Sequence, residues 1–164
     1  MWRDGRAVHH DRRMGVRMER GEAWDRLAGT HTGIVTSLRA DGQPVSVPMW
    51  FVVVDGAVHF RTLRDSFKAR RLRRDPRVGF LVEGGERWAQ LWAVHLTGTA
   101  VFVDDPVVVD RVEAALDAKY AGFRTERTAM ADVTRSHYEQ SSVVIRIDPE
   151  ERIVSWDNAR LGLT

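Results

Sequence analysis

Apolar residues recur at every second position, or run continuously, over much of the chain from residue 32 onward, which is typical of strands. Four strands are predicted in the first half because the runs are rich in β-branched and aromatic residues and are separated by turns: Gly33–Arg39, Pro44–Val54, Val58–Thr62 and Val78–Val82. Asp41-Gly42 and Asp55-Gly56 separate the first three of these strands, and Asp-Gly is a strong hairpin signal.

Helical spacing of apolar residues marks other segments. A short helix is expected over Glu22–Ala28, and a very basic helix over Phe67–Arg74 that ends before Pro76, since proline disfavours helix in the preceding residue. Pro106 suits the first turn of a longer helix. The apolar stripe of that helix is Val109, Val112, Leu116 and Tyr120. A further helix is expected over Thr128–Glu139.

The second half of the chain adds more strands. Trp88–Val103 is predicted to be one long strand or a bent pair with a kink at Gly98, and Ser142–Ile147 and Arg152–Trp156 are predicted to be the last two strands. Strands joined mostly by hairpins, with a few short helices, predict a small, mostly antiparallel β-barrel. The length of 164 residues fits one domain with a real core, expected to span residues 20–164.

Composition narrows the function without naming it. The content is 43% hydrophobic and 29% charged, as in ordinary globular proteins, and the net charge of +2 does not indicate a strong nucleic-acid binder. The absence of cysteine excludes disulfides, thiolate nucleophiles and cysteine-based metal sites. No apolar run is long enough to span a membrane and no secretion signal is evident, so a cytoplasmic protein is predicted.

Residues 1–19 differ from the rest of the chain. They contain five arginines and a His-His pair without clear periodicity, a composition that predicts a disordered basic tail. Two alternatives stay open. The stretch could be an over-long start, with Met14 or Met18 as the first residue, or a basic arm that contacts nucleic acid or an acidic surface.

The start of the basic helix is the strongest candidate for a binding site. A helix N-terminus offers unpaired backbone N–H donors and the positive end of the helix dipole. Ser66 can add a hydroxyl there, and Arg61, Lys68 and Arg71 can add charge. This segment therefore predicts a phosphate site, although Ser-x-Lys taken alone is more often a helix cap with a solvated lysine.

Two further observations concern the chemistry. Pro48 lies inside a predicted strand. Proline cannot donate a hydrogen bond to a neighbouring strand, so either this strand lies at an edge of the sheet there, or a bulge or a ligand replaces the missing bond.

Three histidines, His59, His95 and His137, lack metal-ligand spacing, so no catalytic metal is predicted. No nucleophile elbow is present, which leaves a hydrolase with little support.

The order of these features resembles a known family. The order is strand, Asp-Gly hairpin, Pro-Met-Trp-Phe at 48–51, a second hairpin, Phe-Arg-Thr at 60–62, and Ser-x-Lys at 66–68 opening a helix that ends in Arg-Arg-Asp-Pro-Arg-Val at 73–78. This is similar to the flavin and deazaflavin oxidoreductases of the pyridoxamine 5′-phosphate oxidase-like superfamily, which have a split β-barrel fold. Ser155-Trp156-Asp157 followed by Arg160–Leu163 is similar to the tail of an actinobacterial subgroup associated with coenzyme F420.

The resemblance implies a homodimer with the cofactor in a groove at the interface, and a small-molecule substrate. It also implies a set of cofactor-binding residues: Ser46, Val47, Pro48, Met49 and Trp50 along the tricyclic ring, Arg61 and Thr62 at the ribityl phosphate, and Ser66, Phe67, Lys68 and Arg71 at the start of the basic helix. It implies no catalytic side chain, because the cofactor carries the hydride transfer.

The chain departs from the resemblance at two positions. Pyridoxamine-phosphate oxidases carry an arginine and a lysine flanking the ring strand, where this chain has Ser46 and Phe51. The resemblance therefore implies an F420-dependent oxidoreductase that transfers a hydride between the reduced cofactor and an unidentified small organic acceptor. An FMN-dependent oxidoreductase of the same fold, and a cofactor- or haem-binding protein without turnover, stay open as alternatives. A structural tether is one interpretation of Trp156-Asp157, and the sequence leaves the role of this pair open.

Overall fold

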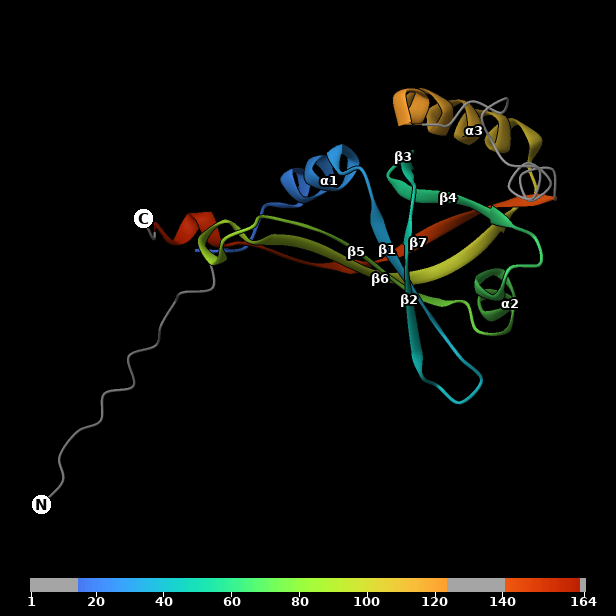
Figure 1. Cartoon of the computed structure of the whole chain (residues 1–164), viewed down its shortest axis with the longest axis horizontal. Coiled ribbons are helices and arrows are strands. Elements are labelled where there is room, and N and C mark those ends of the chain that lie inside the picture. Colours follow the sequence, from blue (N-terminus) through green and yellow to red (C-terminus); the bar gives the residue numbers. More distant parts are fainter. Residues whose placement is uncertain (1–14, 124–140, 163–164) are drawn as a thin grey trace, which may run out of the picture.

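The computed structural model describes residues 15–123 and 141–162, and its centre is one curled sheet of seven antiparallel strands (Figure 1). The strand order is β2-β1-β5-β6-β7-β4-β3. The strands are β1 (Gly33–Leu38), β2 (Pro44–Met49), β3 (Val52–Val54), β4 (Ala57–Leu63), β5 (Arg77–Gly84), β6 (Trp92–Val103) and β7 (Ser142–Asp157). The predicted antiparallel, mostly β architecture is confirmed. The helix predicted over 128–139 lies outside the described residues.

Helices cover the ends and one outer face of the sheet (Figure 1). They are α1 (Arg20–Gly29), α2 (Phe67–Arg74) and α3 (Pro106–Tyr120), with short 3-10 turns η2 (Trp88–Gln90), η3 (Ala121–Phe123) and η5 (Asn158–Leu161). The curled sheet encloses the main core, which includes the fully buried rings of Phe51, Phe60 and Phe80. A second cluster, with Val112, Leu116 and Tyr120, packs α3 on the outer face of the sheet.

The predicted second strand is in fact two strands. The prediction ran without a break over Pro44–Val54, but β2 ends at Met49 and β3 starts at Val52. The backbone N–H and C=O of Phe51, between them, both bond to the Tyr120 hydroxyl at 2.9 Å. These groups are therefore not available to a ladder, and the partner lies on α3, where local sequence gives no sign of it.

The last two predicted strands are instead one continuous strand, β7. The break was expected around Pro149, which cannot donate to a ladder. Pro149 faces Gly98, and the register between β6 and β7 shifts between Leu96 and Gly98. The irregularity at Gly98 was correctly predicted, and this β-bulge is what accommodates the proline. The start of the long strand was wrong, because Trp88–Gln90 form η2 and β6 begins at Trp92.

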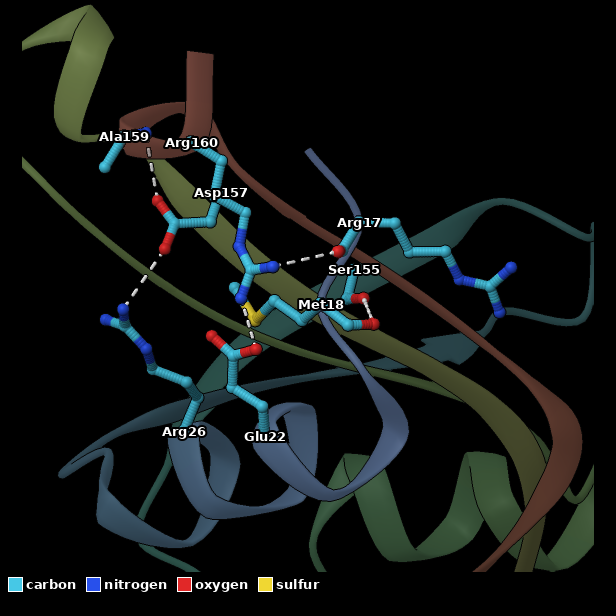
Figure 2. Close-up of polar contacts among 8 residues, drawn as sticks. All are labelled: Arg17, Met18, Glu22, Arg26, Ser155, Asp157, Ala159 and Arg160. Atoms are coloured by element: carbon cyan, nitrogen blue, oxygen red, sulfur yellow. Dashed lines mark hydrogen bonds and ion pairs between the residues drawn. The ribbon is translucent and has the colours of Figure 1, made fainter. Parts of the chain in front are cut away.

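The two ends of the folded domain are joined by a polar cluster (Figure 2). The buried Asp157 accepts hydrogen bonds from Arg26 of α1 at 3.2 Å and from the N–H of Ala159 at 3.0 Å. Its own N–H donates to the carbonyl of Val16 at 2.7 Å. Met18 is buried in the main core, so the described part of the predicted tail is attached to the domain. These contacts fit the interpretation of Trp156-Asp157 as a tether.

Asp157→Ala is expected to destabilise the domain by about 2 kcal/mol, because a buried carboxylate that accepts charge-assisted bonds is worth more than an average hydrogen bond. Urea unfolding followed by circular dichroism measures the change. Glu22→Ala, which removes the partly exposed pair with Arg160 in the same cluster, is the control and should have a smaller effect. Equal losses of unfolding free energy in the two variants would contradict the larger stabilising role assigned to the buried Asp157.

His59 makes stability depend on pH. Burial, with help from the nearby Arg146, lowers the pKa of His59, whose ring lies under α3 and is 2% exposed. The folded chain therefore holds the ring neutral at a pH where the unfolded chain, with a pKa of about 6.5, takes up a proton. The stability that the neutral ring contributes is fully present above the pKa of the unfolded chain. It is lost as the pH falls from there through the lowered pKa of His59 in the folded chain.

His59→Gln is expected to reduce the fall in melting temperature between about pH 7.5 and pH 5.5, the range around the ordinary histidine pKa. Thermal unfolding at a series of pH values measures it. His95→Gln, at a half-exposed position on the uncovered face of the sheet, controls for the loss of an imidazole as such. An unaltered pH profile in His59→Gln would refute this role.

Candidate functional site

The N-terminus of α2 brings together two hydroxyls and two cations. Ser66 is the N-cap, and its Oγ accepts from the N–H of Ala69 at 3.2 Å, as the sequence predicted for a cap. The Oγ1 of Thr62, at the end of β4, lies 3.1 Å from the Ser66 Oγ. Lys68 and Arg71 follow on one flank of the helix, since residues three apart share a face.

These two cations have no counter-charge among the described residues. Burial, and then the neighbouring Arg71, lower the pKa of Lys68, and no described residue accepts a hydrogen bond or ion pair from its ammonium. Arg71 donates from Nε to the buried hydroxyl of Ser37 at 2.8 Å, which is a neutral partner. Half-buried cations that have no carboxylate partner among the described residues favour an anion. Below, Thr62, Ser66, Lys68 and Arg71 are called the cationic cluster.

The strand β2 is an edge strand, one strand away from this cationic cluster. It pairs with β1 alone, and Ser37, which holds Arg71, pairs with Val45 of β2. The edge position predicted as one explanation for Pro48 is thus confirmed. Of the predicted ring strand, Ser46 and Pro48 are exposed while Val47 and Met49 are half-buried. The structure therefore places the cationic cluster against β1, the strand that pairs with β2.

Two predicted residues stand apart from this group. Arg61 donates to the hydroxyl of Ser142 at 2.7 Å and lies 3.6 Å from Glu113 of α3. Neighbours on a strand point to opposite faces, so Arg61 faces α3 while Thr62 faces Ser66. Phe67 is 77% exposed, with the guanidinium of Arg70 5.6 Å from its ring. The structure does not bring either side chain to the cationic cluster.

Trp50, directly after β2, belongs to an aromatic group that the sequence did not indicate. Its ring stacks on Tyr120 with centroids 4.4 Å apart and planes 4° from parallel. His31 and Phe123 adjoin the same group. Tyr120 was predicted to be part of the apolar stripe of its helix, and nothing in that spacing indicates a contact with residue 50. Only the packing of α3 onto β3 reveals it.

The described residues hold no cluster of three histidine, aspartate or glutamate side chains suited to a metal ion. Within residues 15–123 and 141–162, no helix combines the length and apolar character needed to cross a bilayer.

Comparison with known proteins defines the class. The chain matches the family described as pyridoxamine 5′-phosphate oxidase over residues 20–155. The protein therefore belongs to the pyridoxamine 5′-phosphate oxidase family, and the resemblance of its ordered motifs to that superfamily is confirmed. No curated protein matches the chain.

Solved structures agree with this assignment. A conserved hypothetical protein of Mycobacterium tuberculosis is similar at 35% identity, with 93% of this chain and 92% of that chain covered and a TM-score of 0.77. An FAD-binding protein of Mesorhizobium loti is 19% identical, with coverage of 88% and 99% and a TM-score of 0.66. A structure described as an F420 reductase is 22% identical, with coverage of 79% and 94% and a TM-score of 0.57. The split-barrel fold is thus confirmed, and relatives of this fold include both flavin- and F420-associated proteins.

Proposed function

We propose that this protein is an F420-dependent oxidoreductase that transfers a hydride between the reduced deazaflavin and a small organic acceptor. The observation that carries the proposal is a pair of cations, Lys68 and Arg71, that have no counter-charge among the described residues and lie beside the hydroxyls of Thr62 and Ser66. A phosphate at this cationic cluster would meet N–H donors, hydroxyls and positive charge together. The attached ring would then lie along the exposed edge of β2.

The environment of β2 supports the deazaflavin over FMN bound as in pyridoxamine-phosphate oxidases. Phe51 is fully buried and its backbone is held by Tyr120, so this position offers no side chain to a cofactor. Ser46 donates or accepts a hydrogen bond with Thr36 at 2.8 Å and carries no charge. The two basic residues of those oxidases are therefore both missing from this strand.

The chain's own residues bind and orient. F420 supplies the hydride at the central carbon of its ring when bound, so the protein needs no acid–base pair for that step. Lys68, Arg71, Ser66 and Thr62 would hold the phosphate, and the edge of β2 would align the ring. Such fixed placement accelerates a reaction because the translational and rotational entropy of the reactants is lost on binding, before the reacting step.

Titration of ligand-free protein with F420, and in parallel with FMN, tests the proposal through tryptophan fluorescence. Trp50 is 37% exposed at the end of β2 and should report a bound ring. Saturable F420 binding with weaker FMN binding is the expected result. Preference for FMN would move the protein to the flavin-dependent alternative, and binding of neither would refute both oxidoreductase assignments.

We further propose that two copies of the chain associate through the uncovered outer face of the sheet. Register places Trp156, Val154, Leu81, Ile34 and Pro48 on this face, opposite the main core. Trp156 is 37% and Val154 41% exposed. His95 lies in the same row, between Leu81 and Val154. Exposed apolar side chains such as Trp156 and Val154 on one face are typical of an interaction surface, and the row continues into β2, where the cofactor ring is proposed to lie.

Trp156→Glu is expected to shift the protein from dimer to monomer, because it places a charge in the centre of an apolar interface. Sedimentation velocity measures the mass. Val107→Glu is the matched control, since Val107 is 74% exposed on α3, which covers another part of the outer face, over β3 and β7. A wild-type monomer, or equal effects of both substitutions, would contradict this interface.

A further inference from the structure

The hydroxyl of Tyr120 joins three segments that are far apart in the chain. It accepts a hydrogen bond from the N–H of Phe51 at 2.9 Å. It can donate its own proton to the carbonyl of His31 at 2.7 Å or to that of Phe51 at 2.9 Å. Tyr120 is the last residue of α3, His31 lies between α1 and β1, and Phe51 lies between β2 and β3. One fully buried side chain therefore holds the end of α3, the entry to β1 and the exit from β2 together.

A second contact from α3 fixes Phe51 further. The ammonium of Lys119 lies 4.1 Å from the centroid of the Phe51 ring and donates to the carbonyl of Ala28 at 3.1 Å. Phe51 is thus held at its backbone by Tyr120 and at its ring by Lys119. Burial raises the pKa of Tyr120, against the smaller opposite effect of the Phe51 backbone bond. The hydroxyl therefore stays protonated at neutral pH and keeps both its donor and its acceptor role.

The side chain that this arrangement positions is Trp50, the residue directly before Phe51. The Trp50 ring stacks on the Tyr120 ring with centroids 4.4 Å apart and planes 4° from parallel. Exposed side chains alternate along β2 at Ser46 and Pro48, and Trp50 continues that alternation. Trp50 thus continues the exposed side of the strand along which the cofactor ring is proposed to lie.

Core packing alone does not explain the position of Trp50. A large apolar side chain stabilises a fold most when it is buried, yet Trp50 is 37% exposed while the ring beneath it is fully buried. A surface ring held in one orientation loses little entropy when a flat molecule packs against it, and stacked aromatic pairs are favourable beyond their buried area. The arrangement therefore suits ligand binding better than core packing.

We propose that Tyr120 is a positioning residue for the cofactor, whose hydroxyl fixes the backbone of Phe51 so that Trp50 meets the ring of the bound deazaflavin. The inference rests on the proposed function. Tyr120 transfers no proton in the reaction and acts through Trp50. Without the hydroxyl, the exit from β2 adopts other arrangements, and only a fraction of the molecules is ready to bind. The apparent dissociation constant then rises in inverse proportion to that fraction.

Tyr120→Phe keeps the stacked ring and removes the hydroxyl, and it is expected to raise the dissociation constant for F420 about 3- to 10-fold, which corresponds to a competent fraction of about one third to one tenth. Equilibrium dialysis at 25 °C measures the change. The ratio of variant to wild type should be the same at low and high salt, because the substitution alters no charge. The loss in Lys68→Ala, in contrast, should shrink with salt.

Leu116→Ala is the matched control. Leu116 lies one turn earlier on α3, is 5% exposed and belongs to the same core cluster as Tyr120, so its truncation lowers the melting temperature. It makes no bond to the backbone of Phe51 and should leave the dissociation constant unchanged.

A double-mutant cycle separates positioning from general destabilisation. Trp50→Leu should weaken F420 binding at least as much as Tyr120→Phe, and the two substitutions together should lose no more than Trp50→Leu alone, because the hydroxyl acts through Trp50. Trp50→Leu changes an exposed residue, so it tests the inference even if Tyr120→Phe does not fold. An unchanged dissociation constant in Trp50→Leu would overturn the inference.

The outcomes separate this inference from the proposed function. An unchanged dissociation constant in Tyr120→Phe, additive losses in the cycle, or an equal loss in Leu116→Ala would overturn the inference, while F420 binding by the wild type would leave the proposed function standing. If the wild type prefers FMN, the same comparison is made with FMN. A wild type that binds neither would refute the proposed function and this inference with it.

Discussion

Lys68→Ala is expected to weaken F420 binding by about 1.5–3 kcal/mol, or roughly 10- to 150-fold, the contribution of a charge-assisted bond to phosphate. The expectation comes from the half-buried ammonium, which has no acceptor among the described residues and lies beside another cation. Fluorescence titration of the wild type and the variant at one fixed salt concentration measures the change. The loss should shrink as salt is raised, because the interaction is partly screened.

Arg70→Ala is the matched control for this measurement. It removes the same charge from the same helix, but the Arg70 guanidinium packs over the exposed ring of Phe67 and makes no contact with Ser37 or Ser66. It should change the dissociation constant far less than Lys68→Ala. An unchanged dissociation constant in Lys68→Ala, or equal losses in both variants, would remove Lys68 from the phosphate site. The phosphate would then have to bind elsewhere on the protein.

Gly98→Ala is expected to destabilise the domain by about 3 kcal/mol, at the upper end of what overpacking costs. A Cβ at this position would lie 2.3 Å from the carbonyl oxygen of Asp148 and 3.0 Å from Cα of Pro149. Both atoms belong to the backbone of β7, so neither can rotate away. The bulge would have to open, and the register that accommodates Pro149 would be lost.

Thermal and urea unfolding measure this loss, which should appear as a fall in melting temperature of roughly 6–12 °C for a domain of this size. Gly79→Ala is the control in the neighbouring strand β5. Its nearest contacts would be His95 Nε2 at 3.4 Å and Thr36 Cβ at 3.5 Å, both on side chains. A fall of similar size in Gly79→Ala would show that the sheet tolerates no added methyl group and that the bulge is not special.

Local chemistry explains which sequence predictions were confirmed. The hairpins at Asp55-Gly56 and around Gly42 were predictable because Asp55, Gly56 and Gly42 adopt positive φ, which few other residues do without strain. The cap at Ser66 and the end of α2 before Pro76 likewise depend on neighbours in the chain. These features involve residues only a few positions apart, so the sequence alone specifies them.

The errors concern contacts between distant segments. The break between β2 and β3 arises because Tyr120, 69 residues away, bonds to the backbone of Phe51. The continuity of β7 through Pro149 depends on the bulge opposite Gly98. The periodicity of apolar residues and the turn motifs predict neither the break after β2 nor the continuity of β7. Both arise only when separate strands and helices pack together.

The candidate site divides in the same way. Ser66, Lys68 and Arg71 share a helix, so their spacing in the sequence was enough to bring them together. The tertiary structure alone decided that α2 lies against β1, that Arg61 turns toward Glu113, and that His31 meets both Trp50 and Phe123. The sequence by itself determined the hairpin turns, the cap at Ser66 and the family, because local propensity and ordered motifs encode them. Only folding decided which side chains face a common space, because that depends on register and packing between segments far apart in the chain.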